Sequence, residues 1–130
     1  MAVLTKILYA DDEPDIREIV CLTLRELGGY DVMACENGKQ AALAACEYKP
    51  NLLLLDVMMP EMSGPEALMA IRAREEASSI PAIFITAKAK AEEITELNQF
   101  SRSAVIPKPF DPISLPSQIA QLFETLESEE

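Results

Sequence analysis

The sequence predicts a doubly wound α/β domain, in which short parallel strands alternate with helices. Apolar runs of strand length recur along the chain, and a longer segment with helical periodicity follows each of them. The connections between these segments are short, as in a parallel sheet whose strands are joined by helices. Five alternations fill the 130 residues, a length that usually forms one domain. We therefore expect a single domain over residues 1–130.

The first unit of the pattern is a strand, an acidic loop and a helix. The apolar run at residues 5–10 stops at Asp11 and Asp12. Pro14 then suits the first turn of a helix, where a backbone donor is not needed. Apolar positions recur at helical spacing until Gly28 and Gly29 end the helix. The positions expected on the buried face are Ile16, Ile19, Val20, Thr23, Leu24 and Leu27.

The second and third units place the middle of the sheet. Residues 31–35 have the pattern of a strand, and residues 38–48 form an alanine-rich helix. Residues 52–55 are all leucine and end at Asp56. Such a run is apolar on both faces, as expected for a central parallel strand that helices cover on each side. After a loop, a helix is expected over residues 64–76.

The last two units are less strongly patterned. A strand at residues 82–85 ends at Thr86, and a weakly apolar helix is expected over residues 91–100. A short strand at residues 104–106 then leads to Lys108 and Pro109. The final helix should begin near Pro112, and residues 127–130 should form a flexible acidic tail. One face of this helix carries Leu115, Ile119, Leu122, Phe123 and Leu126.

Composition and charge exclude several classes of function. Hydrophobic residues make up 49% and charged residues 25%, which is typical of soluble globular domains. No apolar run reaches the roughly 18 residues of a membrane span, and no signal segment opens the chain, so we expect a cytoplasmic protein. The net charge of −11 opposes binding to nucleic acid and to anionic membranes. Protein partners and cations are favoured instead.

The residue types that are scarce also limit the chemistry. The chain has no histidine, which excludes a histidine nucleophile, general base or metal ligand. Its three cysteines, Cys21, Cys35 and Cys46, lack the spacing of a zinc site and are odd in number. We interpret them as reduced thiols in or near the core. Any catalysis must use carboxylates, lysine, hydroxyl groups or a metal bound through oxygen.

Polar residues end the predicted strands at one edge of the sheet. In open α/β sheets, ligands bind outside the carboxyl ends of the strands. Three carboxylates gathered there repel one another unless a cation compensates their charge. Oxygen-only ligands that leave room for water and phosphate favour Mg²⁺ over Ca²⁺ or Zn²⁺. The strand ends that form this set are Asp11, Asp12, Asp56, Thr86 and Lys108.

The sequence resembles a known family, the receiver domains of two-component response regulators. The resemblance implies a flavodoxin-like (βα)5 fold with strand order 2-1-3-4-5, and a signalling switch rather than an enzyme with its own substrate. Each matching segment is weak alone, but together and in this order they are specific. The segments are ADDEP at residues 10–14, LDVMMP at 55–60, SG at 63–64, TAK at 86–88 and PKPFDP at 107–112.

The family resemblance also implies roles around a metal ion. Asp56 would be the nucleophile that takes a phosphoryl group from a phosphohistidine on a histidine kinase or histidine phosphotransfer protein. Asp12 would bind Mg²⁺ directly, Asp11 partly through water, and the backbone carbonyl of Met58 would complete the protein ligands. Mn²⁺ is a possible substitute. Positioning and charge compensation of this kind are most of what phosphoryl transfer requires of a protein.

Further implied roles concern the phosphoryl oxygens and the response to them. Lys108 would neutralise the oxygens, while the Thr86 hydroxyl and the Ala87 amide would hydrogen-bond to them. The bond between Lys108 and Pro109 should be cis. The change on activation should lie in residues 86–100, with an output partner, unknown from the sequence, docking on the face of the fourth helix, fifth strand and fifth helix.

The sequence departs from the family pattern in two places. Receivers often carry an aromatic residue three positions before the lysine, where this chain has Val105. A rotating aromatic switch is therefore not available there. The glycine and alanine that often precede the fifth strand are replaced by Ser101 and Arg102. This second departure leaves the geometry of that loop open.

Other interpretations remain for individual residues and for the whole chain. Thr86 suits a strand through β-propensity alone, and Lys108 suits an exposed turn. An FMN-binding electron carrier shares the fold, but the acidic residues 11–13 would repel its phosphate. An aspartate-nucleophile phosphohydrolase would need an acid where Met58 stands. The chain ends after the fifth helix, so we expect no output domain in it; a single-domain regulator and a receiver from a hybrid kinase both fit.

Overall fold

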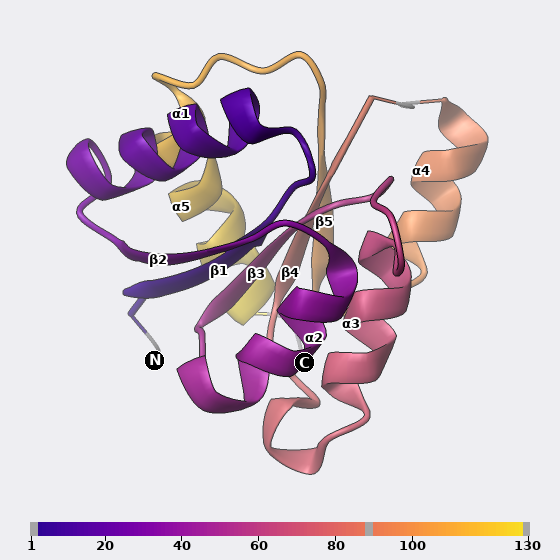
Figure 1. Ribbon diagram of the computed structural model, residues 1–130. Coiled ribbons are helices and arrows are strands. Elements are labelled where there is room, and N and C mark those ends of the chain that lie inside the picture. Colours follow the sequence, from indigo (N-terminus) through magenta and orange to yellow (C-terminus); the bar gives the residue numbers. More distant parts are fainter. Residues whose placement is uncertain (1–2, 88–89, 129–130) are drawn as a thin grey trace.

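The computed structural model describes residues 3–87 and 90–128, which form one parallel five-stranded sheet with helices on both faces (Figure 1). The strand order is β2-β1-β3-β4-β5, as predicted. All four neighbouring pairs are parallel, so each strand ends at the same edge of the sheet. The strands are β1 (Lys6–Ala10), β2 (Asp31–Cys35), β3 (Leu52–Asp56), β4 (Ala82–Thr86) and β5 (Ser103–Pro107).

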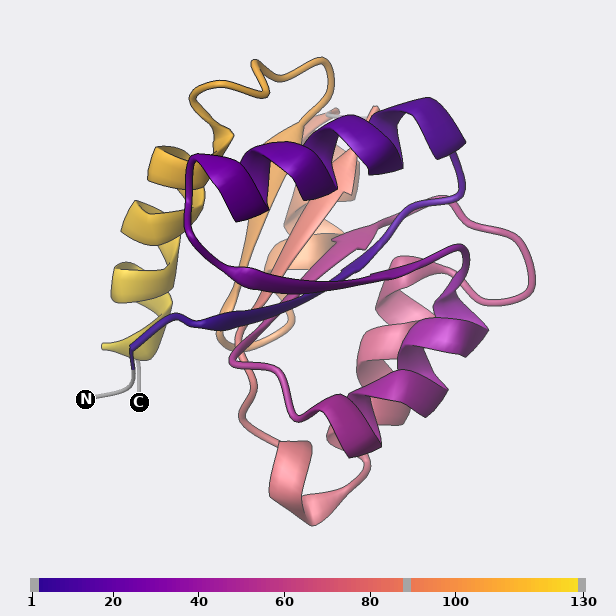
Figure 2. The ribbon, with the colours of Figure 1, turned by 60° about the vertical axis from the view of Figure 1, so that its left-hand side comes forward.

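The helices divide between the two faces of the sheet. Helices α1 and α5 pack on one face, and α2, α3 and α4 pack on the other (Figures 1 and 2). This arrangement is the predicted doubly wound fold. The helices are α1 (Pro14–Glu26), α2 (Gly38–Tyr48), α3 (Gly64–Arg72), α4 (Ala91–Asn98) and α5 (Leu115–Glu127), with a short 3-10 helix, η1 (Glu75–Ala77).

Strand β3 shows why both faces are apolar. Its residues point alternately to the two sides, with Leu52 and Leu54 in the core under α1 and α5, and Leu53 and Leu55 in the core under α2 and α3. All four leucines are completely buried. The continuous apolar run is therefore the sequence signature of a central parallel strand, as predicted.

The first helix presents a slightly different face to the sheet than its spacing indicated. Val20, Cys21 and Leu24 are buried, whereas Ile19 and Leu27 are about half exposed. Cys21 behaves as a small apolar residue, and including it turns the buried stripe away from Ile19. All three cysteines are free thiols, as predicted.

Helices α3 and α4 end earlier than predicted, and α5 begins later. Helix α3 stops at Arg72 because Arg74 has an extended backbone before η1 begins. Helix α5 starts at Leu115 instead of near Pro112, because the Asp111 carboxylate accepts a hydrogen bond from the amide of Ile113 and fixes a turn there. These ends depend on local hydrogen bonds that the apolar pattern does not encode.

The loop before β5, whose geometry the sequence left open, is held by two arginines. Arg102 has a φ of 51° and pairs with Glu127, the last residue of α5, at 2.7 Å. The guanidinium of Arg72 donates hydrogen bonds to the carbonyls of Ile80 and Ser101, each at 2.7 Å, and to that of Arg102 at 3.2 Å. The remainder of the predicted tail, residues 129–130, lies outside the described residues.

Candidate functional site

The sheet register brings Asp11 and Asp56 side by side. Ala10 pairs with Leu55, so the next residue of each chain segment, Asp11 and Asp56, stands at the carboxyl end of its strand. On the other side of β3, Asp56 pairs with Ile85 of β4. The two carboxylates lie at the centre of the sheet edge, where the predicted site was placed.

Hydrogen bonds at its amide, its carboxylate and its carbonyl hold Asp11 in place. Its amide donates to the Cys35 carbonyl at 3.1 Å. Its carboxylate accepts from the Tyr9 hydroxyl at 2.8 Å and from the Glu13 amide at 2.9 Å. Arg17 donates to its carbonyl at 2.8 Å. Because the Asp11 side chain is fully buried, these bonds leave it few alternative orientations.

Asp56 is held by the backbone around it. It ends the fully buried strand β3 and is itself only 4% exposed. The chain then turns back so closely that a Cβ atom at Gly64 would lie 2.4 Å from the Asp56 carbonyl oxygen. Gly64 also donates its amide to the Val57 carbonyl at 3.0 Å. Gly64 therefore permits a close approach of the backbone that a side chain would block.

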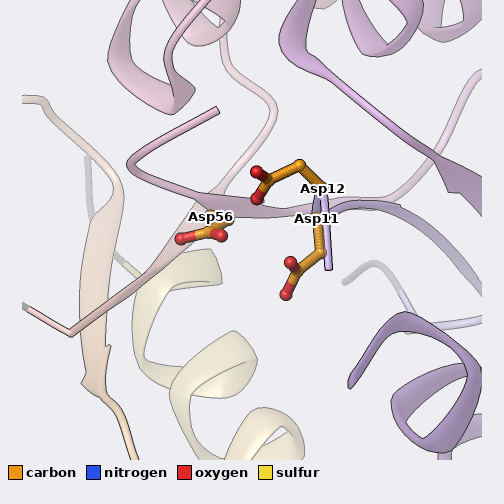
Figure 3. Close-up of side chains that lie close together, drawn as sticks. All are labelled: Asp11, Asp12 and Asp56. Carbon is orange, nitrogen blue, oxygen red and sulfur yellow. The ribbon is translucent and has the colours of Figure 1, made fainter. Parts of the chain in front are cut away.

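Asp11, Asp12 and Asp56 form a compact acidic group (Figure 3). One carboxylate oxygen from each lies within 4.8 Å of the others. Asp11 and Asp56 are buried, whereas Asp12 is exposed, so water can reach the group on the Asp12 side. Clustered carboxylate oxygens with one side open to water fit a small hard cation that keeps part of its hydration shell, as Mg²⁺ does.

Lys108 brings the compensating positive charge from β5. Its amide donates to the Thr86 carbonyl at 2.8 Å, and the peptide bond to Pro109 is cis, as predicted. The ammonium Nζ lies 3.2 Å from Asp56 Oδ2, 3.6 Å from Asp11 Oδ2 and 3.1 Å from Glu13 Oε1. Because its side chain is only 11% exposed, Lys108 is largely enclosed by the protein.

The pKa of Asp56 reflects its burial first and the neighbouring negative charge second. Burial, followed by the charge of Asp11, raises the pKa of Asp56 to about 6, although Lys108 opposes that shift. Burial alone would lower the pKa of Lys108, but the charges of Asp56 and Asp11 outweigh it and the net shift is upward. Lys108 thus stays charged, while the ionised form of Asp56 is costly in the metal-free protein.

The remaining predicted residues, Thr86, Ala87 and Met58, differ widely in their exposure to solvent. Thr86 ends β4 and is 2% exposed. Ala87 is exposed and lines a groove that also includes Lys108. Met58, two residues after Asp56, has an exposed side chain and shares a second groove with Thr86. Lys88, the last residue of the segment that begins at Thr86, lies outside the described residues.

Tyr9 and Glu13 contribute to the site, although the sequence did not indicate either as a functional residue. Burial and the neighbouring Asp11 charge raise the pKa of Tyr9, so its hydroxyl is a neutral donor to that carboxylate. Glu13 competes for the Lys108 ammonium. The alternation of strand residues could have indicated Tyr9, since it stands two positions before Asp11 on the same face. The contact between Glu13 and Lys108 spans 95 positions and has no local signal.

The chain matches the family described as Response regulator receiver domain over residues 7–120. Chemotaxis protein CheY-3 of Vibrio cholerae is 36% identical over 121 residues, which cover 93% of each chain. The phosphate regulon transcriptional regulatory protein PhoB of Pseudomonas aeruginosa is 35% identical over 113 residues, which cover 87% of this chain and 49% of that protein. The chain therefore spans about half the length of PhoB.

A solved structure supports the comparison at the level of the fold and the metal. The receiver domain of a sensor histidine kinase from Pseudomonas aeruginosa, which holds a magnesium ion in its active-site cleft, has a TM-score of 0.81 and 27% identity. The match covers 94% of this chain and 99% of that one. Within residues 3–87 and 90–128 of the present chain, no helix has the length and apolar character to cross a membrane.

Proposed function

The chain belongs to the response regulator receiver domain family, and on that premise we propose that Asp56 is its phosphoacceptor. Receiver domains take a phosphoryl group from histidine kinases and act as signalling switches. The pocket of Asp11, Asp12 and Asp56 is the part of this receiver that serves Mg²⁺ and phosphorylation. Asp56 is the acceptor because it ends the central strand with its carboxylate against the Lys108 ammonium.

The acidic group supplies the protein ligands of the metal. Asp12 is exposed and would bind Mg²⁺ directly, whereas Asp11, already held by Tyr9 and Glu13, would bind partly through water. The Met58 backbone carbonyl would complete the set, and Mn²⁺ could replace Mg²⁺. When bound, the ion contributes positive charge that offsets the carboxylates and the incoming phosphoryl oxygens.

Residues of the chain then orient the transfer. An Asp56 oxygen forms a bond to phosphorus as the bond from phosphorus to the donor's imidazole nitrogen breaks. Lys108, 3.2 Å from Asp56, is placed to neutralise the phosphoryl oxygens. The Thr86 hydroxyl and the Ala87 amide, at the end of the neighbouring strand β4, would hydrogen-bond to those oxygens.

The partners follow from the same chemistry. The donor would be a phosphohistidine on a histidine kinase or a histidine phosphotransfer protein, and both would meet the receiver in the cytoplasm. The output partner would dock on the face formed by α4, β5 and α5. A single-domain regulator and a hybrid-kinase receiver both remain compatible, because CheY-3 matches over 93% of its length and a kinase receiver over 99%.

Intact-mass measurement after treatment with acetyl phosphate and Mg²⁺ tests the assignment. The wild-type chain should gain one phosphoryl group, and chelation of the metal should prevent the gain. Asp56→Asn should gain none, while Asp15→Asn, which changes an exposed acid outside the pocket, should behave as wild type. Phosphorylation of Asp56→Asn at the wild-type rate would refute the role of Asp56.

A further inference from the structure

Glu93, in the first turn of α4, has a carboxylate oxygen that is shielded from solvent. Among the described residues, this oxygen, Oε2, has no hydrogen-bond partner. A carboxylate oxygen in such a place has lost contacts with water without gaining a donor, which is unfavourable. The proposed function gives this side chain no role. The burial of this oxygen does not stabilise α4.

The shielded oxygen belongs to a residue that shares a cavity with two residues next to the proposed phosphorylation site. Glu93 lines a cavity of about 230 Å³ together with Thr86 and Met58. Thr86 ends β4, and Met58 follows Asp56 by two residues. Glu96 also lines this cavity, but it is exposed, so water screens its charge. Of the two glutamates that line the cavity, Glu93 therefore carries the less screened charge.

Helix α4 is weakly attached to the rest of the domain. Leu97 is the one buried residue among its eight, and the Lys90 side chain makes no hydrogen bond that caps its first turn. In Figure 1, α4 lies at the outside of the molecule, and its main packing partner is β5. A helix with so little buried apolar surface needs little free energy to shift.

We propose that Glu93 is the residue through which the charge of the phosphoryl group displaces α4. The inference rests on the proposed phosphorylation of Asp56. A phosphoryl group brings additional negative charge to the site, and repulsion between it and a shielded carboxylate is only weakly screened. The repulsion opposes phosphorylation while α4 stays in place and is relieved when α4 moves. By linkage, a neutral residue at this position should favour the phosphoryl-bound state and reduce the movement.

Replacement of Glu93 by neutral residues tests the inference with beryllofluoride, an anionic mimic of the phosphoryl group. With Mg²⁺ present, Glu93→Gln should bind beryllofluoride about three- to tenfold more tightly than wild type. Its amide shift changes over Ala91–Asn98 should also be smaller. Glu92→Gln is the matched control, since it removes the same charge from the same turn but does not line the cavity. It should resemble wild type.

Salt dependence separates charge from packing. The affinity difference between Glu93→Gln and wild type should shrink as ionic strength rises, and Glu93→Ala should show the same gain. Equal affinity in Glu93→Gln and Glu92→Gln, an undiminished shift of α4, or a difference that salt leaves unchanged would each overturn the inference. Wild-type protein that binds no beryllofluoride would instead refute the proposed phosphorylation.

Discussion

Lys108 carries one positive charge but lies close to three carboxylates. Its Nζ lies 3.1 Å from Glu13, 3.2 Å from Asp56 and 3.6 Å from Asp11. Of these partners, Glu13 is the most exposed, with a side chain 54% accessible to solvent, so its hold on the lysine is the weakest. Lys108 can therefore exchange Glu13 for phosphoryl oxygens at little cost while it stays beside Asp56.

The raised pKa of Asp56 predicts how stability depends on pH without metal. Its folded-state pKa is about 6, above the ordinary value of 3.8, so the folded state binds the proton more tightly. Its contribution to stability is therefore complete below about pH 4 and is lost as pH rises through about 6. Asp56→Asn should remove that loss and be more stable than wild type at pH 7, by about 1–3 kcal/mol.

Urea unfolding in chelator between pH 4.5 and 8 measures this difference. The stability gap between Asp56→Asn and wild type should widen from the acid end of the range to the neutral end. Asp15→Asn should show no such trend, because Asp15 is exposed on α1. Stability curves for Asp56→Asn and wild type that run parallel over the whole range would show that Asp56 carries no excess cost of ionisation.

At the scale of elements, the strands were predicted closely and the helix ends were not. Each strand is an apolar run that stops at a polar residue, so its end is visible in the sequence, as at Asp56 and Thr86. Helix ends depend on contacts made in three dimensions. Arg72 closes α3 while it binds carbonyls before β5, and Asp111 delays the start of α5. Neither contact leaves a periodic signal.

The site residues at strand ends could also be predicted from the sequence, whereas the residues that support them could not. Strand-end residues could be placed at one edge because parallel strands share their direction, and the register then brought Asp11 beside Asp56. The sequence gives no comparable rule for side chains that only support the site. Tyr9 and Glu13 act through hydrogen bonds to Asp11 and Lys108, and their roles required the structure.

Helix α4 is the element expected to respond to phosphorylation. It has one buried residue, Leu97, and it follows β4, whose last residue is Thr86. Beryllofluoride with Mg²⁺ should therefore shift amide signals mainly over residues 86–100. Val105 packs against the core beside β4 and is too small to act as a rotating switch, so its methyl signals should change little. Large shifts confined to α1 and α2 would contradict this expectation.

At the scale of the whole molecule, negative charge opposes the folded state. The chain carries a net charge of −11, and folding concentrates three of its carboxylates within 4.8 Å. The unfolded chain separates Asp56 from the adjacent pair Asp11 and Asp12, so a divalent cation that needs all three carboxylates should bind the native state far better than the unfolded chain. Metal binding and folding are then thermodynamically linked.

Millimolar Mg²⁺ should raise the melting temperature of the wild-type protein for this reason. A Mg²⁺ concentration of about 100 times the dissociation constant stabilises the folded state by about 2.7 kcal/mol. Each kcal/mol of added stability raises the melting temperature of a domain of this size by about 2–8 °C. Asp12→Ala should lose most of this gain, yet melt higher than wild type in chelator, because one of three repelling charges is gone. Asp15→Ala removes the same charge from an exposed position outside the group and should keep the full gain.

Sodium chloride at matched ionic strength should reproduce little of the effect, since it screens charge without binding the group. If Mg²⁺ and sodium chloride raised the melting temperature equally, or if both variants kept the gain, the stabilisation would come from general screening, and the acidic group would not be a formed metal site.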